Sequence, residues 1–423
     1  MDDVKLFGLP AEKGRWLLIP LGITVLLCLG TVYSWSIFRK PLEQLLDIGA
    51  TESLLPFSVL LVVFAILMPI TGFYIDRVGS RVVTAVGGVV MGVGYLLSSL
   101  NGNISMLTLT YGVIAGVGVG ITYGVPLAIA AKWFPDKKGI AVGLTVIGFG
   151  LSPLITAPLA RTFIASYGVR QTFVILGLAF TLIILAISTT LKMPPKGWKP
   201  ANWNPPATVS TRASATGGMA MLQTQTFYGL WLCYAIGTFV GLAAIGISSP
   251  LAQEIIKLDA ATAALTVSLF AVFNGAGRFC FGWFTDHFTP KLAAIVSFVM
   301  ILIASIMMLS ASQGDVLTYL VAFSLFTFAF GGWLAIAPTA TLTLFGTEDY
   351  TKNYGIVFTA FGVGALGGTL LAGQIRDIFG SYTAFFYPTA ALAMVGIVLA
   401  VFMLKGSFTT TAIVEGSNSS NSS

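Results

Sequence analysis

The stretch GFYIDRVGSR at residues 72–81 places an acidic and a basic residue beside two glycines in a short turn between apolar runs. A weaker copy, GWFTDHFTPK, occupies residues 282–291, which is 210 positions later. A separation of 212 positions recurs in three further pairs: Pro126 with Pro338, Gly168 with Gly380, and Phe173 with Phe385. Because a repeat in constant register indicates a duplicated structural unit, the sequence predicts two related halves.

The regions around both copies are strongly apolar. Of the 423 residues, 56% are hydrophobic and only 9% are charged, and the mean hydropathy is +0.90. Soluble domains carry about 25% charged residues. The charges form short clusters between apolar runs of roughly 20 residues, which is the length of a helix that crosses a bilayer. The composition therefore predicts an all-α membrane protein.

Twelve spans are predicted from these runs. The first is too long for the apolar region of a signal peptide and lacks a small-residue cleavage site, so we expect it to span the membrane. The predicted spans are 16–38, 53–75, 82–100, 106–130, 139–160, 171–191, 227–251, 260–284, 292–312, 316–340, 355–375 and 382–404.

Polar segments divide the chain. We predict a six-helix bundle over residues 1–191, a Pro-rich cytoplasmic linker over 192–225, a second bundle over 226–405 and a disordered tail over 406–423. The linker contains KMPPKGWKPANWNPP, and the tail ends in GSNSSNSS. Polar, Pro-rich or Ser-rich segments of this kind do not form a packed core.

The loop charges predict an orientation. With both termini in the cytoplasm, 15 Lys and Arg residues fall in cytoplasmic loops and 6 fall outside, which follows the positive-inside rule. The net charge of +6 therefore reflects membrane sidedness and does not indicate nucleic-acid binding. We expect an integral protein of the plasma (inner) membrane, in contact with the lipid bilayer and monomeric.

GFYIDRVGSR resembles the loop signature of the major facilitator superfamily, G-x-x-x-D-[RK]-x-G-x-[RK]. The resemblance implies the fold of that superfamily, with twelve transmembrane helices in two six-helix bundles. It also implies that the loop takes part in gating, with the second copy contributing less because His287 replaces its basic residue. The residues that match the gating motif are Gly72, Asp76, Arg77, Gly79 and Arg81, together with Asp286 of the second copy.

Three segments resemble the oxalate/formate exchanger branch of that superfamily, close to the proton-linked monocarboxylate transporters. They are KWFPDKKGIAVGL at 132–144, TQTFYGLW at 224–231 and NGAGRFCFGWFTD at 274–286. The resemblance implies a secondary carrier that works by alternating access. In carriers built from two repeats, the substrate site lies between the repeats near the middle of the membrane.

Arg278 is the one charged residue that we place inside a predicted span. It precedes Asp286 by eight residues, or about 12 Å of helix, which puts it within the hydrocarbon layer. A cation there requires an aqueous cavity or a partner. With no acid in the predicted spans, the natural counter-ion is a substrate carboxylate held by the guanidinium group. The alternative is a structural arginine that binds backbone carbonyls or extends towards the cytoplasm.

Asn274 lies one helical turn before Arg278 and is expected on the same helix face. Animal monocarboxylate transporters carry an Asp–Arg pair at this spacing, and the Asp is implicated in proton coupling. Since Asn replaces the Asp here, the proton route stays open. The proton could travel on the substrate carboxylate, or an outer carboxylate such as Glu254 or Asp259 could relay it.

Phe361 occupies the position at which the oxalate exchanger carries a second cation, a lysine in helix eleven. A single arginine neutralises one carboxylate, so we predict a monocarboxylate such as lactate, pyruvate, acetate or formate. Aromatic residues on three other spans are expected to complete the substrate site, although lipid-facing or packing roles are the alternative: Tyr33, Tyr123 and Trp333.

The leading functional prediction is a proton-coupled symporter of a small monocarboxylate. Exchange of two carboxylates is the alternative mechanism, and a channel or a membrane sensor that does not transport is the alternative class. The spans contain no histidine or carboxylate for catalysis, so we predict no enzyme activity and no metal site. No Walker or dinucleotide motif follows a strand, so we predict no cofactor.

Overall fold

The computed structural model describes residues 4–100, 102–195, 198–200, 221–346 and 350–404. The side chains of residues 71–74, 76, 138, 286 and 351 are not described. The predicted tail and most of the predicted linker lie outside the described residues.

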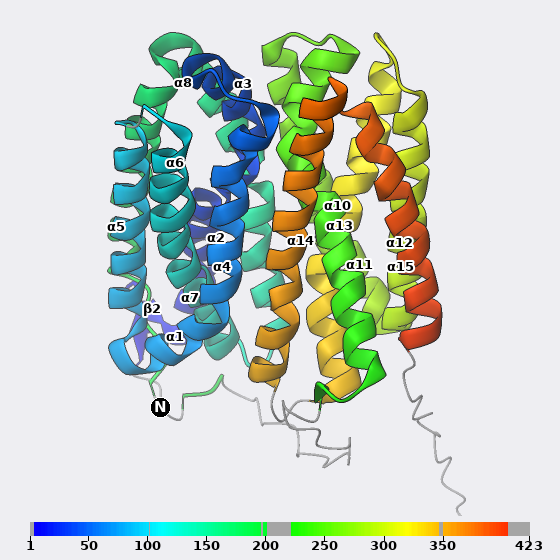
Figure 1. Ribbon diagram of the computed structural model, residues 1–423. Helices are drawn as coiled ribbons and strands as arrows, with labels where there is room; N and C mark the ends of the chain where they lie inside the picture. The colour runs from blue at the N-terminus through cyan, green and yellow to red at the C-terminus, as the bar shows by residue number, and fades with distance from the viewer. Residues whose placement is uncertain (1–3, 101, 196–197, 201–220, 347–349, 405–423) are drawn as a thin grey trace, which may run out of the picture.

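The helices before the linker form one bundle, drawn in blue to green in Figure 1. A short hairpin of β1 (Lys5–Leu6) and β2 (Leu9–Pro10) precedes them. The helical segments are α1 (Ala11–Gly14), η1 (Arg15–Leu17), α2 (Leu18–Leu29), η2 (Gly30–Ser34), α3 (Trp35–Leu46), α4 (Ala50–Val78), α5 (Ser80–Ser98), α6 (Ile104–Leu107), η3 (Thr108–Ala115), α7 (Gly116–Trp133) and α8 (Lys138–Ser188).

The helices after the linker form a second bundle beside the first, drawn in green to red in Figure 1. They are α10 (Gln225–Leu251), η4 (Ala252–Ile256), α11 (Ala260–His287), α12 (Pro290–Ser310), α13 (Val316–Phe345), α14 (Tyr350–Phe379), η5 (Thr383–Phe385) and α15 (Phe386–Met403). Below, the two bundles are called the N-half and the C-half.

The described residues contain 11 helices long and apolar enough to cross a membrane, and one of them accounts for two spans. Helix α8 has 51 residues, or about 75 Å of helix, which is more than twice the hydrocarbon thickness. Its backbone breaks at Gly168, where φ is +81°. The part before the break runs alongside α2, and the part after it packs against α5. The chain therefore reverses at Gly168, which confirms twelve spans.

The repeat predicted from the sequence is present in the backbone. Gly168 and Gly380 both have positive φ, +81° and +71°, at the turns that lead into the last span of each half. A side chain is strained in this region of φ, so glycine is favoured at both turns. The phenylalanines that follow them, Phe173 and Phe385, are each 1% exposed.

Two pairs of long helices join the halves: α4 with α14, and α8 with α11. Glycines allow close approach in both pairs. A Cβ on Gly362 of α14 would lie 3.0 Å from the Cβ of Ala65 in α4. A Cβ on Gly150 of α8 would lie 2.8 Å from Oδ1 of Asn274 in α11. Positions 150 and 362 are 212 residues apart, so the two contacts correspond in the repeat.

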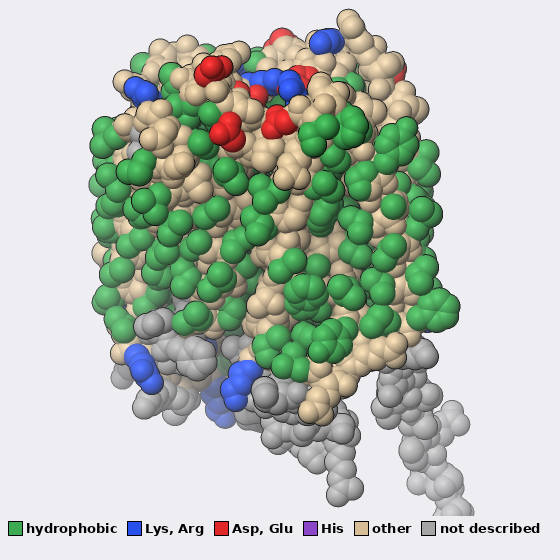
Figure 2. Space-filling view, in the orientation of Figure 1, with side chains coloured by type: hydrophobic (Ala, Val, Ile, Leu, Met, Phe, Trp, Pro, Cys, Tyr) green, Lys and Arg blue, Asp and Glu red, His purple; other side chains and the backbone are tan. Residues whose placement is uncertain are grey.

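The outer surface is divided by chemistry. Hydrophobic side chains cover the flank of both halves, while Lys and Arg lie at the two ends and Asp and Glu gather towards the upper end in this view (Figure 2). This distribution fits a bundle whose flank contacts lipid and whose ends contact water. We call these the Arg15 end, where α2 begins, and the Arg39 end, where α4 begins.

The segment at 132–144 is anchored at the Arg15 end by an ion pair. Nη1 and Nη2 of Arg15 lie 2.5 and 2.8 Å from the two carboxylate oxygens of Asp136. Nη1 of Arg15 also donates to the carbonyl of Trp133, whose indole donates to the carbonyl of Lys192 at 2.7 Å. These contacts tie the start of the first span and the start of the linker to the α7–α8 turn.

Candidate functional site

Arg278 lies in the middle of α11 and is only 6% exposed. Its Nε donates to Oδ1 of Asn274 at 3.1 Å, which confirms the predicted contact across one helical turn. Its Nη1 donates to the carbonyl of Val146 at 3.1 Å, and this bond crosses from the C-half to the N-half.

Two buried donors of this pair have no hydrogen-bond partner among the described residues: Nη2 of Arg278 and Nδ2 of Asn274. None of the described carboxylates forms an ion pair with Arg278. A buried donor left unpaired is destabilising by about 1–3 kcal/mol, and more when it is charged. The site is therefore suited to an anionic ligand that accepts hydrogen bonds.

Arg278 opens onto a cavity between the halves with an empty volume of about 320 Å³. Most of its walls are aromatic, and the arginine is the one cation among them. The lining residues are Tyr33, Phe64, Tyr123, Val146, Phe149, Arg278, Leu334, Tyr354, Phe358 and Phe361.

Most of the predicted site residues meet at this cavity. Tyr33, Tyr123 and Phe361 line it together with Arg278, although they come from different helices. Asn274 contacts Arg278 and lines a second small cavity, which shares Tyr33 with the first.

Trp333 lies elsewhere. Its ring packs against the backbone of Gly237 and lies 5.2 Å from the ring of Phe298 on α12, within the C-half. The cavity is lined instead by the next residue, Leu334. Consecutive helical residues differ by about 100° in direction, so a shift of one position moves a side chain off the cavity wall.

Six lining residues were not predicted, and the repeat could have identified one of them. Phe149 corresponds to the predicted Phe361 at a separation of 212 positions, and both line the cavity. Val146 and Phe358 correspond to each other in the same way, but neither was a predicted site residue. For these two and for Phe64, Leu334 and Tyr354, no signal separates them from the many other apolar and aromatic residues of their helices.

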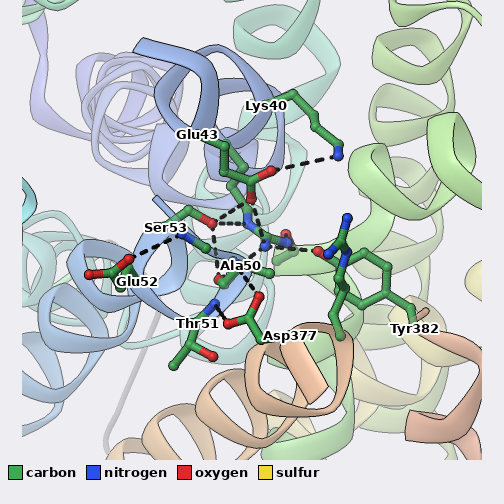
Figure 3. A network of polar contacts seen from close by, with 12 residues as sticks. Lys40, Glu43, Ala50, Thr51, Glu52, Ser53, Asp377 and Tyr382 are labelled. Carbon is green, nitrogen blue, oxygen red and sulfur yellow. Dashed lines mark hydrogen bonds and ion pairs between the residues drawn. The ribbon is translucent and has the colours of Figure 1, made fainter. Parts of the chain in front are cut away.

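The Arg39 end of the bundle is closed by hydrogen bonds between the halves (Figure 3). We expected Arg39 in an outer loop, but it lies within α3 and is 0% exposed. Its guanidinium donates to Ser53 at 2.9 Å and Glu43 at 3.1 Å in the N-half. It also donates to the carbonyl of Gly246 at 3.1 Å and the hydroxyl of Tyr382 at 2.9 Å in the C-half. These partners explain how helix α3 can bury the charge.

Two carboxylates add to this closure. Glu254 of the C-half pairs with Lys40 of the N-half and with Arg376, whose Nε lies 3.0 Å away. Asp377 accepts from the backbone N–H groups of Ala50 and Thr51 at 2.8 and 2.9 Å and so caps the N-terminus of α4 (Figure 3).

Neither carboxylate considered as a proton relay is free for that role. Glu254 is held between two cations, which favour its ionised form. Asp259 caps α11, and hydrogen bonds from the Thr262 hydroxyl and backbone lower the pKa of its carboxyl. Neither residue is among the lining residues of the Arg278 cavity.

The gating motif lies at the Arg15 end, where α4 gives way to α5. Gly79 forms the turn with φ at +92°, and Arg77 and Arg81 are exposed. In the second copy Thr289 occupies the turn with φ at −100°, so no glycine is required there. The side chains of Gly72, Asp76 and Asp286 lie outside the described part of the structure.

The chain was compared with known families and proteins. A sequence model of the Major Facilitator Superfamily matches residues 21–348 and, overlapping these, residues 230–419. The oxalate:formate antiporter of Oxalobacter formigenes is 29% identical over 92% of this chain and 91% of its own length. The uncharacterized MFS-type transporter YhjX of Escherichia coli (strain K12) is 28% identical over 84% of this chain and 87% of its own length. Monocarboxylate transporter 13 of Rattus norvegicus is 25% identical over 78% of this chain and 74% of its own length.

Solved structures show the same fold at low identity. The nucleoside transporter NupG superposes with a TM-score of 0.72 at 12% identity, covering 92% of this chain and all of that one. A bacterial homologue of the human lysosomal transporter Spinster superposes with a TM-score of 0.64 at 17% identity, covering 92% of this chain and 95% of that one. The chain therefore belongs to the major facilitator superfamily and is a membrane transporter rather than an enzyme.

Proposed function

We propose that this protein is a secondary carrier for a small monocarboxylate, and that its halves rock by alternating access about Arg278. The observation that carries the proposal is the buried guanidinium on an aromatic cavity, with Nη2 unpaired among the described residues. A carboxylate supplies the missing charge and acceptor atoms together. Relatives named as an oxalate:formate antiporter and as monocarboxylate transporters support this ligand class.

The lining of the cavity favours one carboxylate over two. Arg278 is the one Lys or Arg among the described lining residues. Phe361 is fully buried and stacks on Phe358 with ring centroids 5.0 Å apart, giving the cavity an apolar wall. Such a wall accommodates hydrogen or a short aliphatic group and disfavours a second, unneutralised carboxylate.

We propose that transport is proton-coupled symport, with the proton carried by the substrate. No described lining residue is a carboxylate or a histidine that could carry it. Protonation of the bound anion weakens its attraction to Arg278 and so promotes its release. Acid-stimulated uptake with alkalinisation of the medium supports symport, and uptake indifferent to a proton gradient overturns it.

Exchange of two carboxylates is the second candidate, favoured by the burial of Arg278. In an empty carrier the charge of Arg278 is met only by the carbonyl of Val146 and the amide oxygen of Asn274 among the described residues. If these two neutral acceptors do not compensate the buried charge, the empty carrier cannot change conformation. Only the loaded carrier then moves, and the protein exchanges one substrate for another. Counterflow of labelled substrate without proton dependence would identify this mechanism.

We further propose that the Arg15 end faces the cytoplasm and that the protein is a monomer in the plasma (inner) membrane. The loop-charge bias supports this orientation. In this orientation the closed Arg39 end is the outer gate, and the motif of Arg77, Gly79 and Arg81 belongs to the inner gate.

The decisive experiment measures uptake of radiolabelled formate, acetate, lactate, pyruvate and oxalate by purified protein in liposomes. We expect saturable uptake of at least one monocarboxylate and a loss of at least a hundredfold in Arg278→Ala. Full uptake by Arg278→Ala would overturn the site, and the absence of uptake of all five compounds by the unaltered protein would overturn the substrate class. Uptake that does not saturate would favour a channel.

A further inference from the structure

We propose that Gly150 is a positioning residue for Arg278, and that its lack of a side chain forms the notch in which the guanidinium rests. This inference rests on the proposed carboxylate site. It assigns the N-half a direct part in the site through its backbone.

The space beside Gly150 is filled by the two polar side chains of the site. A Cβ at this position would lie 2.8 Å from Oδ1 of Asn274, 3.1 Å from Nε of Arg278 and 3.2 Å from Cζ of Arg278. A Cβ is essentially never found within 3.0 Å of a non-bonded heavy atom, and at 3.0–3.4 Å the neighbouring atom must shift by a few tenths of an ångström. A methyl group at residue 150 would therefore push on the amide and the guanidinium.

Other close-packed glycines of the N-half serve a different purpose. A Cβ on Gly148, two residues earlier, would meet the backbone of Ile23, with the carbonyl oxygen 2.5 Å away. A Cβ on Gly30 would meet the carbonyl oxygen of Phe149 at 2.3 Å. Those glycines allow helices of one half to pack together, whereas the nearest atoms to Gly150 belong to side chains of the anion site.

The notch works together with the carbonyl of Val146. Val146 and Gly150 lie one turn apart on α8 and so share a face of that helix. Nη1 of Arg278 is held by the carbonyl of Val146, and Nε is held by Asn274. Fixing two of its three nitrogens at the notch leaves Nη2 as the nitrogen without a described partner. A pre-oriented donor of this kind binds a carboxylate without first losing side-chain freedom.

The repeat supplies a matched control. Gly362 corresponds to Gly150 and packs against α4, with its nearest contacts at the Cβ of Ala65, 3.0 Å, and the Cα of Val62, 3.7 Å. These contacts are apolar, so Gly362→Ala perturbs the same kind of interface without touching the guanidinium.

The test measures KM and maximal rate in liposomes, using whichever of the five labelled compounds the unaltered protein transports. We expect Gly150→Ala to raise KM roughly tenfold, because the methyl group displaces the guanidinium to which the substrate binds. We expect the maximal rate to stay within about twofold, because the substitution acts on binding rather than on the movement of the loaded carrier. We expect Gly362→Ala to change KM by less than threefold. A purely structural role for Gly150 would lower the amount of active protein and so the maximal rate, without this selective change in KM.

A double variant makes the test independent of how well Gly150→Ala folds. Asn274→Ala removes the atom closest to the new methyl group and frees the guanidinium to move. We therefore expect Gly150→Ala to raise KM by less than threefold when it is added to Asn274→Ala. An equal rise on both backgrounds, or a KM for Gly150→Ala no higher than that for Gly362→Ala, would overturn the inference while leaving the proposed function intact. Absence of uptake by the unaltered protein would overturn both.

Discussion

Nη1 of Arg278 in the C-half lies 3.1 Å from the carbonyl oxygen of Val146 in the N-half, so the group that we propose to bind the anion also joins the two halves. A substrate carboxylate bonds to a guanidinium more strongly than a neutral carbonyl does. Binding therefore competes with a contact between the halves. This competition gives a physical link between occupancy of the site and the relative movement of the halves.

A second cation in the cavity should change the substrate preference. Phe361 lines the same cavity as Arg278, so Phe361→Lys places an ammonium group near the bound anion. We expect oxalate uptake to appear, because the second cation neutralises the second carboxylate. We expect monocarboxylate uptake to fall at least tenfold, because a carrier loaded with a monoanion keeps one buried cation unpaired while it changes conformation. Uptake of labelled oxalate and formate in liposomes measures both changes.

Phe149→Lys is the control for position, because Phe149 corresponds to Phe361 in the repeat and lines the other wall. Gain of oxalate uptake in Phe361→Lys alone would place the second anchor on α14. Folded Phe361→Lys protein that takes up no oxalate would contradict the two-cation argument.

The Arg15–Asp136 pair should make stability depend on pH in the acid range. The hydrogen bond from Arg15 lowers the pKa of Asp136, so the folded state favours the ionised carboxylate. A lowered folded-state pKa gives stability that is present above the ordinary aspartate pKa of about 4 and is lost as pH falls through the folded value. We expect Asp136→Asn to be less stable by about 1–2 kcal/mol at pH 7, a typical value for charged hydrogen bonds that are partly exposed.

Thermal unfolding in detergent at pH 7 and below pH 4 measures this effect. The difference between the unaltered protein and Asp136→Asn should shrink at the lower pH, since both then lack the ionised partner. A difference for Asp136→Asn that stays constant with pH would contradict the assigned ion pair.

The sequence predicted most of the fold because the physical signals were local. Apolar runs between charge clusters gave the spans, and a separation of 212 positions gave the repeat, which the positive φ of Gly168 and Gly380 reproduces. Arg278 stood out as a charge within an apolar run, and helix geometry alone placed Asn274 beside it. These inferences needed no knowledge of how the helices pack.

The rest of the site depends on helix rotation and on distant partners. The run around Trp333 is apolar on every side, so no pattern indicated that Leu334 would face the cavity instead. The burial of Arg39 depends on Gly246 and Tyr382, which follow it by 207 and 343 positions. Nothing near Arg39 in the sequence indicates those acceptors.

Loss of Arg39 should open the Arg39 end of the carrier. This residue donates across the interface to Gly246 and Tyr382 and is fully buried. Removing one partner of a buried charged network is destabilising by about 3–5 kcal/mol. The share of this stabilisation that comes from the bonds to Gly246 and Tyr382 holds the two halves together, so its loss favours the conformation in which this end is open. We expect Arg39→Met to expose Ser248, which lines the small cavity beside Asn274.

Labelling by a membrane-impermeant maleimide measures this opening. The reporter is Ser248→Cys in a background where Cys28, Cys233 and Cys280 are replaced by Ala. We expect the labelling rate from the Arg39 side to rise at least tenfold with Arg39→Met and to stay unchanged with Arg161→Ala. An unchanged rate in Arg39→Met would show that this network does not hold the gate closed.

Asn274 should determine whether the site itself responds to pH. Its Oδ1 accepts from Nε of Arg278 at 3.1 Å, so Asn274→Asp places a carboxylate in ion-pair distance of the guanidinium. The new pair neutralises Arg278 and competes with the substrate for it. We expect uptake at pH 7 to fall at least tenfold. Because the guanidinium lowers the pKa of the new carboxyl, we expect uptake to recover only at a pH low enough to protonate the paired carboxyl.

The comparison with Asn274→Ala separates charge from contact. That variant also loses the hydrogen bond to Nε, but it introduces no titrating group, so its uptake should fall by a factor that does not change with pH. The ratio of the uptake rates of the two variants, measured from pH 5 to pH 8, isolates the effect of the carboxyl. A ratio near one at every pH would mean that residue 274 does not act on the charge of Arg278 and that its role is confined to packing. A ratio that rises towards acid pH would show that one amide-to-acid exchange suffices to make anion binding at Arg278 depend on a proton.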